Sequence, residues 1–348
     1  MTRGVARPPF SVVLVVLAVG LVAMAVLAIG IGTVTIPPLR VVSLLAVAFD
    51  APWTGRDAEP DLAILMAIRV PRVLVAGLVG AALAVAGAQM QGLFQNPMAS
   101  PDVIGTSTGG AMGAVLAFTL GLAQRHVGWI PALSCLGAAL SLAVVYGLTT
   151  RRGRTPVALL LLAGVALNAL LGSLTAFLIT LSWVRYEVAQ EVVFWLMGGL
   201  DDRTWTHVWL AGPLVAIGVA AAVALSRDLD LFTTGEDSAA TLGLDVERAK
   251  QRVLAVAALL SGTAVAVCGV IGFVGLIVPH GLRLIVGPSH RRLVPAAALA
   301  GAIFVIAADL VARTALAPNQ IRLGIVTGLC GAPFFLWLLG RYRREVGA

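Results

Sequence analysis

The chain has 348 residues, of which 59% are hydrophobic and 12% are charged, and its formal net charge is +7. Soluble domains contain about 45–50% apolar and about 25% charged residues, so this composition excludes a soluble globular protein and indicates an integral membrane protein. Its uncharged runs of about twenty residues predict an all-α fold, because a β-barrel would show alternating segments of about ten. The basic residues stand between the apolar runs, where they set orientation, so they do not indicate nucleic-acid binding.

Breaks at charged residues, glycines and prolines divide the chain into about ten transmembrane helices within one domain, residues 1–348. The uncharged run 253–282 is long and rich in glycine, so we expect two short or broken helices there. The predicted spans are 11–32, 73–93, 102–121, 128–149, 157–181, 206–225, 253–270, 271–287, 293–313 and 322–340.

The distribution of basic residues predicts the orientation. With a cytoplasmic N-terminus, the inside loops hold 15 of the 24 basic residues, which favours an even number of spans with both termini inside. The linker over residues 33–68 then lies outside, and residues 39–49 are expected to follow the membrane interface.

The span 73–93 has unusually specific ends. Arg69 and Arg72 flank a proline before it, and a polar turn with two prolines, residues 96–101, follows it. A merely structural span would not need such ends, so we expect function there. The next span carries Gly105, Gly109 and Gly113 on one helical face, which predicts close helix packing or, alternatively, a polar pathway.

No residue cluster is typical of catalysis or of a metal site. The four histidines stand in separate segments, and no phosphate-binding GxxxxGK[ST] loop is present, so uphill transport would need an ion gradient or a partner. The clear acid within a span is Asp309, four residues before Arg313, a spacing that suits a structural ion pair. A proton site at Asp309 is the alternative, and it would indicate a gradient-driven secondary transporter.

The loop before the seventh span predicts a short surface helix over residues 234–243. Thr233 and Glu236 have the spacing of a capping box, and Gly243 is placed to end the helix. Its Ala/Leu face suits a groove on another protein, although spacing alone leaves an ordinary solvated connector open.

A series of segments from Arg69 to Leu339 resembles the FecCD-type permeases, the membrane subunits of ABC importers for iron–siderophore complexes, haem and cobalamin. The order and spacing match, so no single generic motif carries the resemblance. The segments are RVPR, GAALAVAGAQMQGLFQNPMASPDVIG, LLLAGVALN, WLMGG, GEDSAATLG, GFVGLIVPHGLR, GPSHRRLVP, ADLVAR and GIVTGLCGAPFF.

The resemblance implies a type II ABC importer permease fold and roles for four groups of residues. Outer arginines would dock the binding protein, an inner loop would enter the ATPase, two inner turns would form the cytoplasmic gate, and a PHxxR signature would shape the eighth span. Pro279 is expected to kink that helix while His280 satisfies freed backbone groups. The groups are Arg69, Arg72 and Arg313 for docking; Gly235, Glu236, Ala239, Ala240, Leu242 and Gly243 for coupling; Asn96, Pro97, Met98, Thr155 and Pro156 for the gate; and Pro279, His280 and Arg283 for the signature.

One departure concerns the outer corner. The family often has Glu and Pro before the last span, where this chain has Gln320 and Arg322. The change removes an acidic contact and adds positive charge, which is expected to strengthen attraction to an acidic docking partner.

The resulting expectation is a multi-pass permease of the bacterial cytoplasmic membrane that imports a large metal chelate by alternating access. Its partners would be a second permease subunit (a homodimer, or a pseudo-symmetric heterodimer), two ABC ATPases that hold ATP and Mg, and an outer binding protein. The chain itself would bind no cofactor or metal and would not be an enzyme. A ferric siderophore is the favoured substrate, with haem or cobalamin as alternatives.

Overall fold

A computed structural model describes residues 8–32, 34–50, 60–182 and 186–346. Within these ranges all regular elements are helices, and seven helical segments are long and apolar enough to cross a membrane. The seven are α1 (Phe10–Gly30), the continuous segment of α3 (Pro60–Ile64), η1 (Leu65–Arg69) and α4 (Val70–Leu93), α6 (Trp129–Thr149), α7 (Val157–Ser182), α9 (Trp205–Ala224), α12 (Val246–Cys268) and α14 (His290–Thr314).

The other three predicted spans coincide with helices that are too short, or apolar over too short a stretch, to count among these seven. Those three are α5, α13 and α15, so the all-α membrane fold is confirmed while the number of crossings stays a prediction. The further helices are α2 (Pro38–Asp50), η2 (Pro101–Ile104), α5 (Thr106–Thr119), α8 (Tyr186–Leu196), α10 (Ser226–Phe232), α11 (Glu236–Thr241), α13 (Val274–Val286) and α15 (Leu323–Val346).

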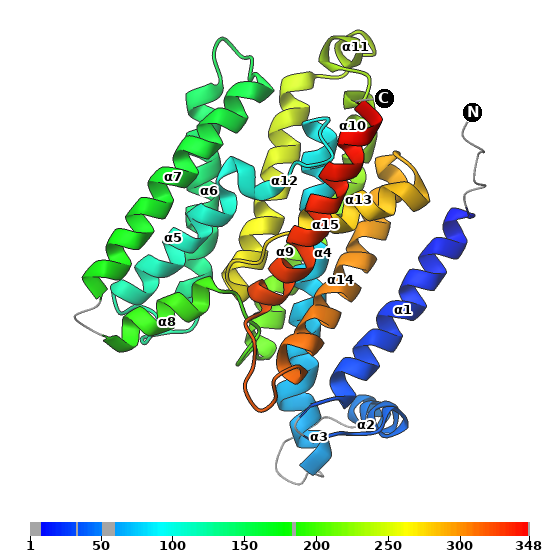
Figure 1. Cartoon of the computed structure of the whole chain (residues 1–348), viewed down its shortest axis with the longest axis vertical. Coiled ribbons are helices and arrows are strands. Elements are labelled where there is room, and N and C mark those ends of the chain that lie inside the picture. Colours follow the sequence, from blue (N-terminus) through cyan, green and yellow to red (C-terminus); the bar gives the residue numbers. More distant parts are fainter. Residues whose placement is uncertain (1–7, 33, 51–59, 183–185, 347–348) are drawn as a thin grey trace.

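Helix α4 runs through the middle of the bundle, where it packs against α14, α12, α13 and α9 (Figure 1). Nearly every side chain from Val79 to Leu93 is buried. The close approach depends on glycines: a Cβ atom at Gly80 would overlap the carbonyl oxygen of Gly301, and one at Gly87 would overlap that of Gly275. In lipid the hydrophobic effect does not drive helices together, so close van der Waals packing at small residues stabilises this contact instead.

The helices α5 to α8 form a second group, which joins the first through contacts of α12 with α5 and α6. The glycine face of α5 makes this packing possible, because Cβ atoms at Gly109 and Gly113 would overlap the backbone of α6 at Gly137 and Leu133. The structure thus supports the packing interpretation of this face.

The long run 253–282 is broken as predicted. Helix α12 ends at Cys268 and α13 begins at Val274, and Gly269 and Phe273 both take positive φ angles, 74° and 68°. Gly269 combines this positive φ with a ψ of −163°, a conformation that glycine adopts without steric cost, which explains why the helix can end there.

The two ends of the bundle are different. Helix α11 stands at one end, on the side where α1 begins and α15 ends, and α2 and α3 lie at the other (Figure 1). We name these the α11 end and the α3 end. Helix α2 lies at the α3 end and covers residues 39–49, and the placement of these residues along the membrane interface stays a prediction.

The glycine contacts give opposite expectations for two alanine variants. Gly80→Ala should lower the thermal stability of the purified permease, because overpacking a tight contact costs about 1–3 kcal/mol. Gly147→Ala is the matched control, since no atom lies within 4 Å of a Cβ there and α6 should gain helix propensity. Equal unfolding temperatures for the two variants in detergent would contradict the close α4–α14 contact.

Candidate functional site

The α3 end is organised by a proline. Pro71 has no backbone N–H, so the helix widens into the π-helical turn η1 just before it, and the carbonyl of Met66 loses its helical donor. Trp205 Nε1 donates to that carbonyl at 2.8 Å and ties α9 to this point. The widened turn fixes the directions in which Arg69 and Arg72 leave the helix.

Arg69 is buried, with only 5% of its surface exposed. Its Nη1 donates to the carbonyls of Ile29 at 2.8 Å and Gly30 at 2.9 Å, and its Nη2 donates to that of Val34. Ile29 and Gly30 are the last residues of α1, so their carbonyls lack helical donors, and Val34 lies just beyond this helix. A guanidinium placed there also interacts favourably with the helix dipole.

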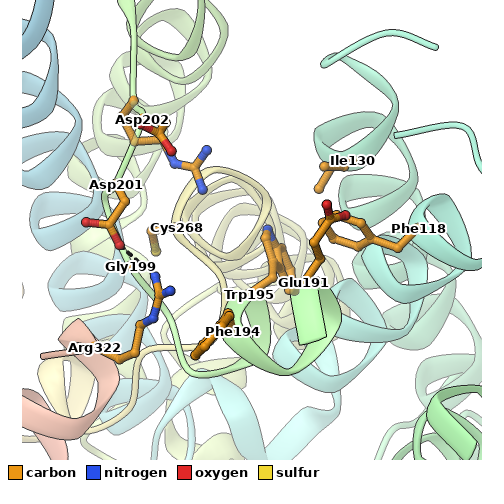
Figure 2. Close-up of a pocket in the computed structure, with 11 residues that line it drawn as sticks. Phe118, Ile130, Glu191, Phe194, Trp195, Gly199, Asp201, Asp202, Cys268 and Arg322 are labelled. Atoms are coloured by element: carbon orange, nitrogen blue, oxygen red, sulfur yellow. Dashed lines mark hydrogen bonds and ion pairs between the residues drawn. The ribbon is translucent and has the colours of Figure 1, made fainter. Parts of the chain in front are cut away.

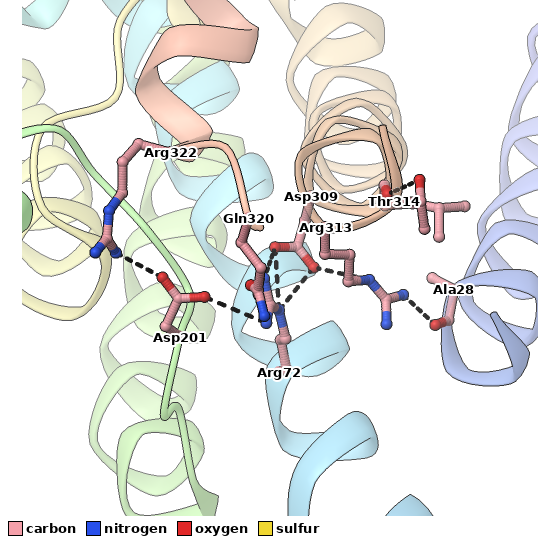
Figure 3. A network of polar contacts seen from close by, with 9 residues as sticks. Ala28, Arg72, Asp201, Asp309, Arg313, Thr314, Gln320 and Arg322 are labelled. Atoms are coloured by element: carbon pink, nitrogen blue, oxygen red, sulfur yellow. Dashed lines mark hydrogen bonds and ion pairs between the residues drawn. The ribbon is translucent and has the colours of Figure 1, made fainter. Parts of the chain in front are cut away.

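Arg72 forms an ion pair with Asp309 at this end (Figure 3). Its Nε and Nη2 donate to the Asp309 carboxylate at 2.8–3.1 Å, in the bidentate geometry that is strongest for arginine. Its Nη1 also lies 3.4 Å from Asp201 Oδ1, and Gln320 Oε1 accepts from both Nη atoms at 3.1 Å.

Two more arginines extend this network in opposite directions (Figure 3). Arg313 Nε lies 3.6 Å from Asp309 Oδ2, and its Nη2 donates to the carbonyl of Ala28. Arg322 Nη1 lies 2.6 Å from Asp201 Oδ2. A continuous polar network therefore connects α1, α14, α4, the segment before α9 and the start of α15.

The structure places the three predicted docking arginines at the same end, but all three bond to other groups of the same chain. Arg69 is buried, and only 12% of the Arg72 side chain and 8% of the Arg313 side chain are exposed, so they do not form a free positive surface in this conformation. The Asp309–Arg313 contact predicted from the sequence is present at 3.6 Å, but Asp309 lies closer to Arg72, at 2.8 Å. Asp201 and Gln320 were missed as partners, because they lie more than 120 positions from Arg72.

A cavity of about 300 Å³ opens beside this network, lined by α5, α6, α8, the end of α12, the segment before α9 and Arg322 (Figure 2). Phe118 and Trp195 pack edge to face in its wall, and the Arg322 guanidinium lies 4.5 Å from the centre of the Phe194 ring. Arg203 also lines it, and burial lowers the pKa of that guanidinium, which Asp201 and Asp202 partly offset. Charged groups over aromatic walls suit one part of a large amphipathic molecule.

The α11 end carries the predicted coupling residues. Helix α11 spans Glu236–Thr241, and Leu242 directly after it is 63% exposed, whereas Ala239 is buried. Gly243 takes φ +87°, and the N–H groups of Gly243 and Leu244 donate to the carbonyls of Ala240 and Ala239. This is a Schellman ending, so Gly243 ends the helix as predicted.

The predicted capping box at the start of α11 is wrong. The N-cap residue is Gly235, with φ +95°, and the Thr233 hydroxyl donates to the carbonyl of Asp230 instead. The positive φ of Gly235 turns the chain before the helix, which moves Thr233 out of reach of the first turn.

The first predicted gate segment is a tight turn after α4. Asn96 Oδ1 accepts from the N–H of Met98 at 2.9 Å, which is an Asx turn, and Pro97 lies between them. The preceding residue, Gln95, donates from Nε2 to the carbonyl of Phe232 at the end of α10. The turn is thereby joined to the segment that leads into α11.

The second predicted gate segment lies at the start of α7. Thr155 is buried, with its hydroxyl 2.9 Å from that of Thr150, while Pro156 is exposed. The side chain of Lys250 reaches the carbonyl of Thr155, a contact that the sequence did not indicate.

The signature residues lie in α13. Pro279 is inside this helix, as expected, but His280 Nδ1 and Arg283 Nη2 are buried without hydrogen-bond partners among the described residues. The expectation that His280 satisfies backbone groups therefore finds no support in the described hydrogen bonds.

The comparisons with known proteins decide the family. A model of the FecCD transport family matches residues 20–341. The chain belongs to this family. It is 45% identical over 85% of its length to a cobalamin import system permease of Halobacterium salinarum, with 78% of that protein covered. It is also 38% identical to the hemin transport permease of Yersinia pestis, over 86% of this chain and 90% of that one.

Two further relatives agree. The Fe(3+) dicitrate permease FecD of Escherichia coli is 39% identical over 80% of this chain and 86% of its own. A solved structure described as an inward-facing conformation of a metal-chelate type ABC transporter superimposes with a TM-score of 0.83 at 30% identity, covering 95% and 99% of the two chains. The protein is therefore a multi-pass permease subunit of an ABC importer, and its fold is that of this class.

The Arg72–Asp309 pair gives a stability prediction. Arg72→Met should strongly lower the unfolding temperature, because breaking a buried ion pair from one side costs about 3–5 kcal/mol. Arg72→Met combined with Asp309→Asn should recover part of the loss, since no unpaired carboxylate remains. Thermal unfolding of the two single variants and the double variant measures the coupling, and strictly additive losses would contradict the pairing.

Proposed function

We propose that this permease imports a large metal chelate across the bacterial cytoplasmic membrane as a homodimer with two separate ABC ATPases. The exposed α11–Leu242 segment supports this assignment most directly, because it presents an apolar side chain on a well-formed protruding turn at one end of the bundle. That end would face the cytoplasm together with both termini. The chain would bind no cofactor, and ATP and Mg would be held by the ATPases.

The single transmembrane domain, residues 1–348, would then have its functional surfaces at its two ends. At the α11 end, Gly235, Glu236, Ala239, Ala240, Leu242 and Gly243 would enter the ATPase. The neighbouring turns at Asn96–Met98 and Thr155–Pro156 would close the cytoplasmic gate. The PHxxR residues Pro279, His280 and Arg283 would shape α13.

At the α3 end, an outer binding protein would dock over the arginine network. Because Arg69 and Arg313 cap the end of α1, we assign them to holding this surface, and Arg72 with Arg322 to meeting acidic groups of the partner. Contact would require those carboxylates to compete with Asp201 and Asp309. Charge complementarity of this kind accelerates association more than it adds affinity.

A ferric siderophore, haem and cobalamin all remain candidate substrates. The cavity beside Arg322 is at the lower end of the roughly 300–1,000 Å³ range of ligand pockets, so one subunit would hold only part of such a molecule. The relatives include permeases for cobalamin, hemin and ferric citrate, and we propose the siderophore first.

A gradient-driven transporter is the rival mechanism, and the geometry of Asp309 weighs against it. Both of its carboxylate oxygens face guanidinium groups of Arg72 and Arg313. Both oxygens are thus occupied by contacts within the bundle, so we assign Asp309 to holding α4 and α14 together rather than to a proton path.

Leu242→Asp tests the coupling surface. We expect the variant to lose capture of the ATPase while keeping the wild-type unfolding temperature, because the side chain contacts solvent rather than the bundle. Leu120→Asp is the matched control: Leu120 is 64% exposed, in the turn between α5 and α6, and should leave capture intact. Undiminished capture by Leu242→Asp would contradict the assignment of this surface.

The substrate is tested by uptake into proteoliposomes that contain the permease, its ATPase and its binding protein. A ferric siderophore, haem and cobalamin are offered separately, with ATP enclosed. We expect uptake of the siderophore and little of the other two, and preferential uptake of either rival would reassign the substrate.

A further inference from the structure

Lys250, the only lysine in the sequence, occupies an unusual position at the α11 end. Only 1% of its surface is exposed, although it lies in the second turn of α12. Its Nζ donates to Glu236 Oε2 at 2.7 Å, to the carbonyl of Thr155 at 2.9 Å and to Glu247 Oε1 at 3.2 Å. All three donors of the ammonium group are therefore used.

Two of these partners belong to segments with different proposed roles. Glu236 is the first residue of α11, which would contact the ATPase, and Thr155 precedes α7 in the second gate segment. Lys250, a residue of α12, therefore hydrogen-bonds both to the proposed coupling helix α11 and to the proposed gate segment.

The segment that Lys250 holds is a stiff turn. Arg151 and Arg154 exchange both backbone hydrogen bonds at 3.0 Å, and Arg152 and Gly153 between them take φ angles of 51° and 73°. Two consecutive positive φ angles are the mark of a tight two-residue hairpin turn. Because this turn leads directly through Thr155 into α7, a displacement at the Thr155 carbonyl would also displace the start of α7.

The charges explain why the position holds a lysine. Without a cation there, the carboxylates of Glu236 and Glu247 would face each other across the site. The ammonium is a compact charge whose three donors point at converging oxygens, whereas the planar guanidinium of arginine suits bidentate partners. A cavity of about 460 Å³ flanks the cluster, lined by Arg152, Arg154 and Ala240 among others, so α11 has room to shift relative to the turn.

We propose that Lys250 is the positioning residue that transmits movement of α11 to the Thr155–Pro156 gate segment, through its bonds to Glu236 and the Thr155 carbonyl. The proposal rests on the proposed function, since it needs an ATPase that moves α11. Lys250 touches neither substrate nor nucleotide in this scheme. Its loss should uncouple ATP hydrolysis from transport rather than abolish assembly.

The test compares ATP hydrolysed per chelate molecule taken up, in proteoliposomes of the complete complex with its loaded binding protein. Lys250→Met should raise this ratio about five- to tenfold, the lower end of the range for coupling between two sites, while ATPase capture stays normal. Glu236→Gln, whose side chain is partly exposed and whose loss should be tolerated in folding, should raise it in the same direction. The double variant should be no worse than the poorer single one, because both act through one bond.

Arg248→Met is the matched control, because it removes a basic side chain from the same helix whose pair with Asp245 is solvent-exposed. Its ratio should equal that of the wild type. A wild-type ratio in Glu236→Gln, or in a folded Lys250→Met, would overturn the proposal and assign Lys250 a purely structural role. Absence of any captured ATPase with the wild-type chain would instead refute the proposed function.

Discussion

The close contact of α4 with α14 and α13 is the constraint on which the rest of the structure depends. In a membrane, helices gain little from burying apolar side chains against each other, so packing depends on how near their backbones come. Gly80 and Gly301, and Gly87 and Gly275, bring these backbones into contact. With α4 fixed in this way, Arg72 in its first turn contacts Asp309. Gln95, just after its last turn, donates to the carbonyl of Phe232.

Charge is concentrated at the two ends of the bundle, where Arg72 and Lys250 each bridge segments that are distant in sequence. Arg72 joins α4 to α14 and to the segment before α9, and Lys250 joins α12 to α11 and to the turn before α7. A buried ion pair contributes little net stability compared with well-packed apolar residues. We interpret these pairs as devices that fix geometry at the surfaces where partner proteins would act.

Much of the architecture was predictable from the sequence because it depends on local patterns. The apolar runs located the helices, and the glycines of run 253–282 located the break before Val274. Contacts between distant residues were not predictable: nothing near Asp309 points to Arg72, and nothing near Lys250 points to Thr155. The capping box failed because spacing could not reveal the positive φ of Gly235. The three arginines expected to dock a binding protein lie at the same end of the bundle, but the engagement of Arg69 and Arg313 with α1 carbonyls depends on the folded position of that helix.

The central claim is that hydrolysis of ATP by a partner, and not an ion gradient, drives transport through this permease. It is tested most directly by chelate uptake into proteoliposomes that hold the complete complex, under two conditions. In the first, ATP is enclosed and ionophores remove every ion gradient; in the second, a proton or sodium gradient is imposed without ATP. The account predicts uptake only in the first condition. Uptake that follows the gradient and ignores ATP would contradict it.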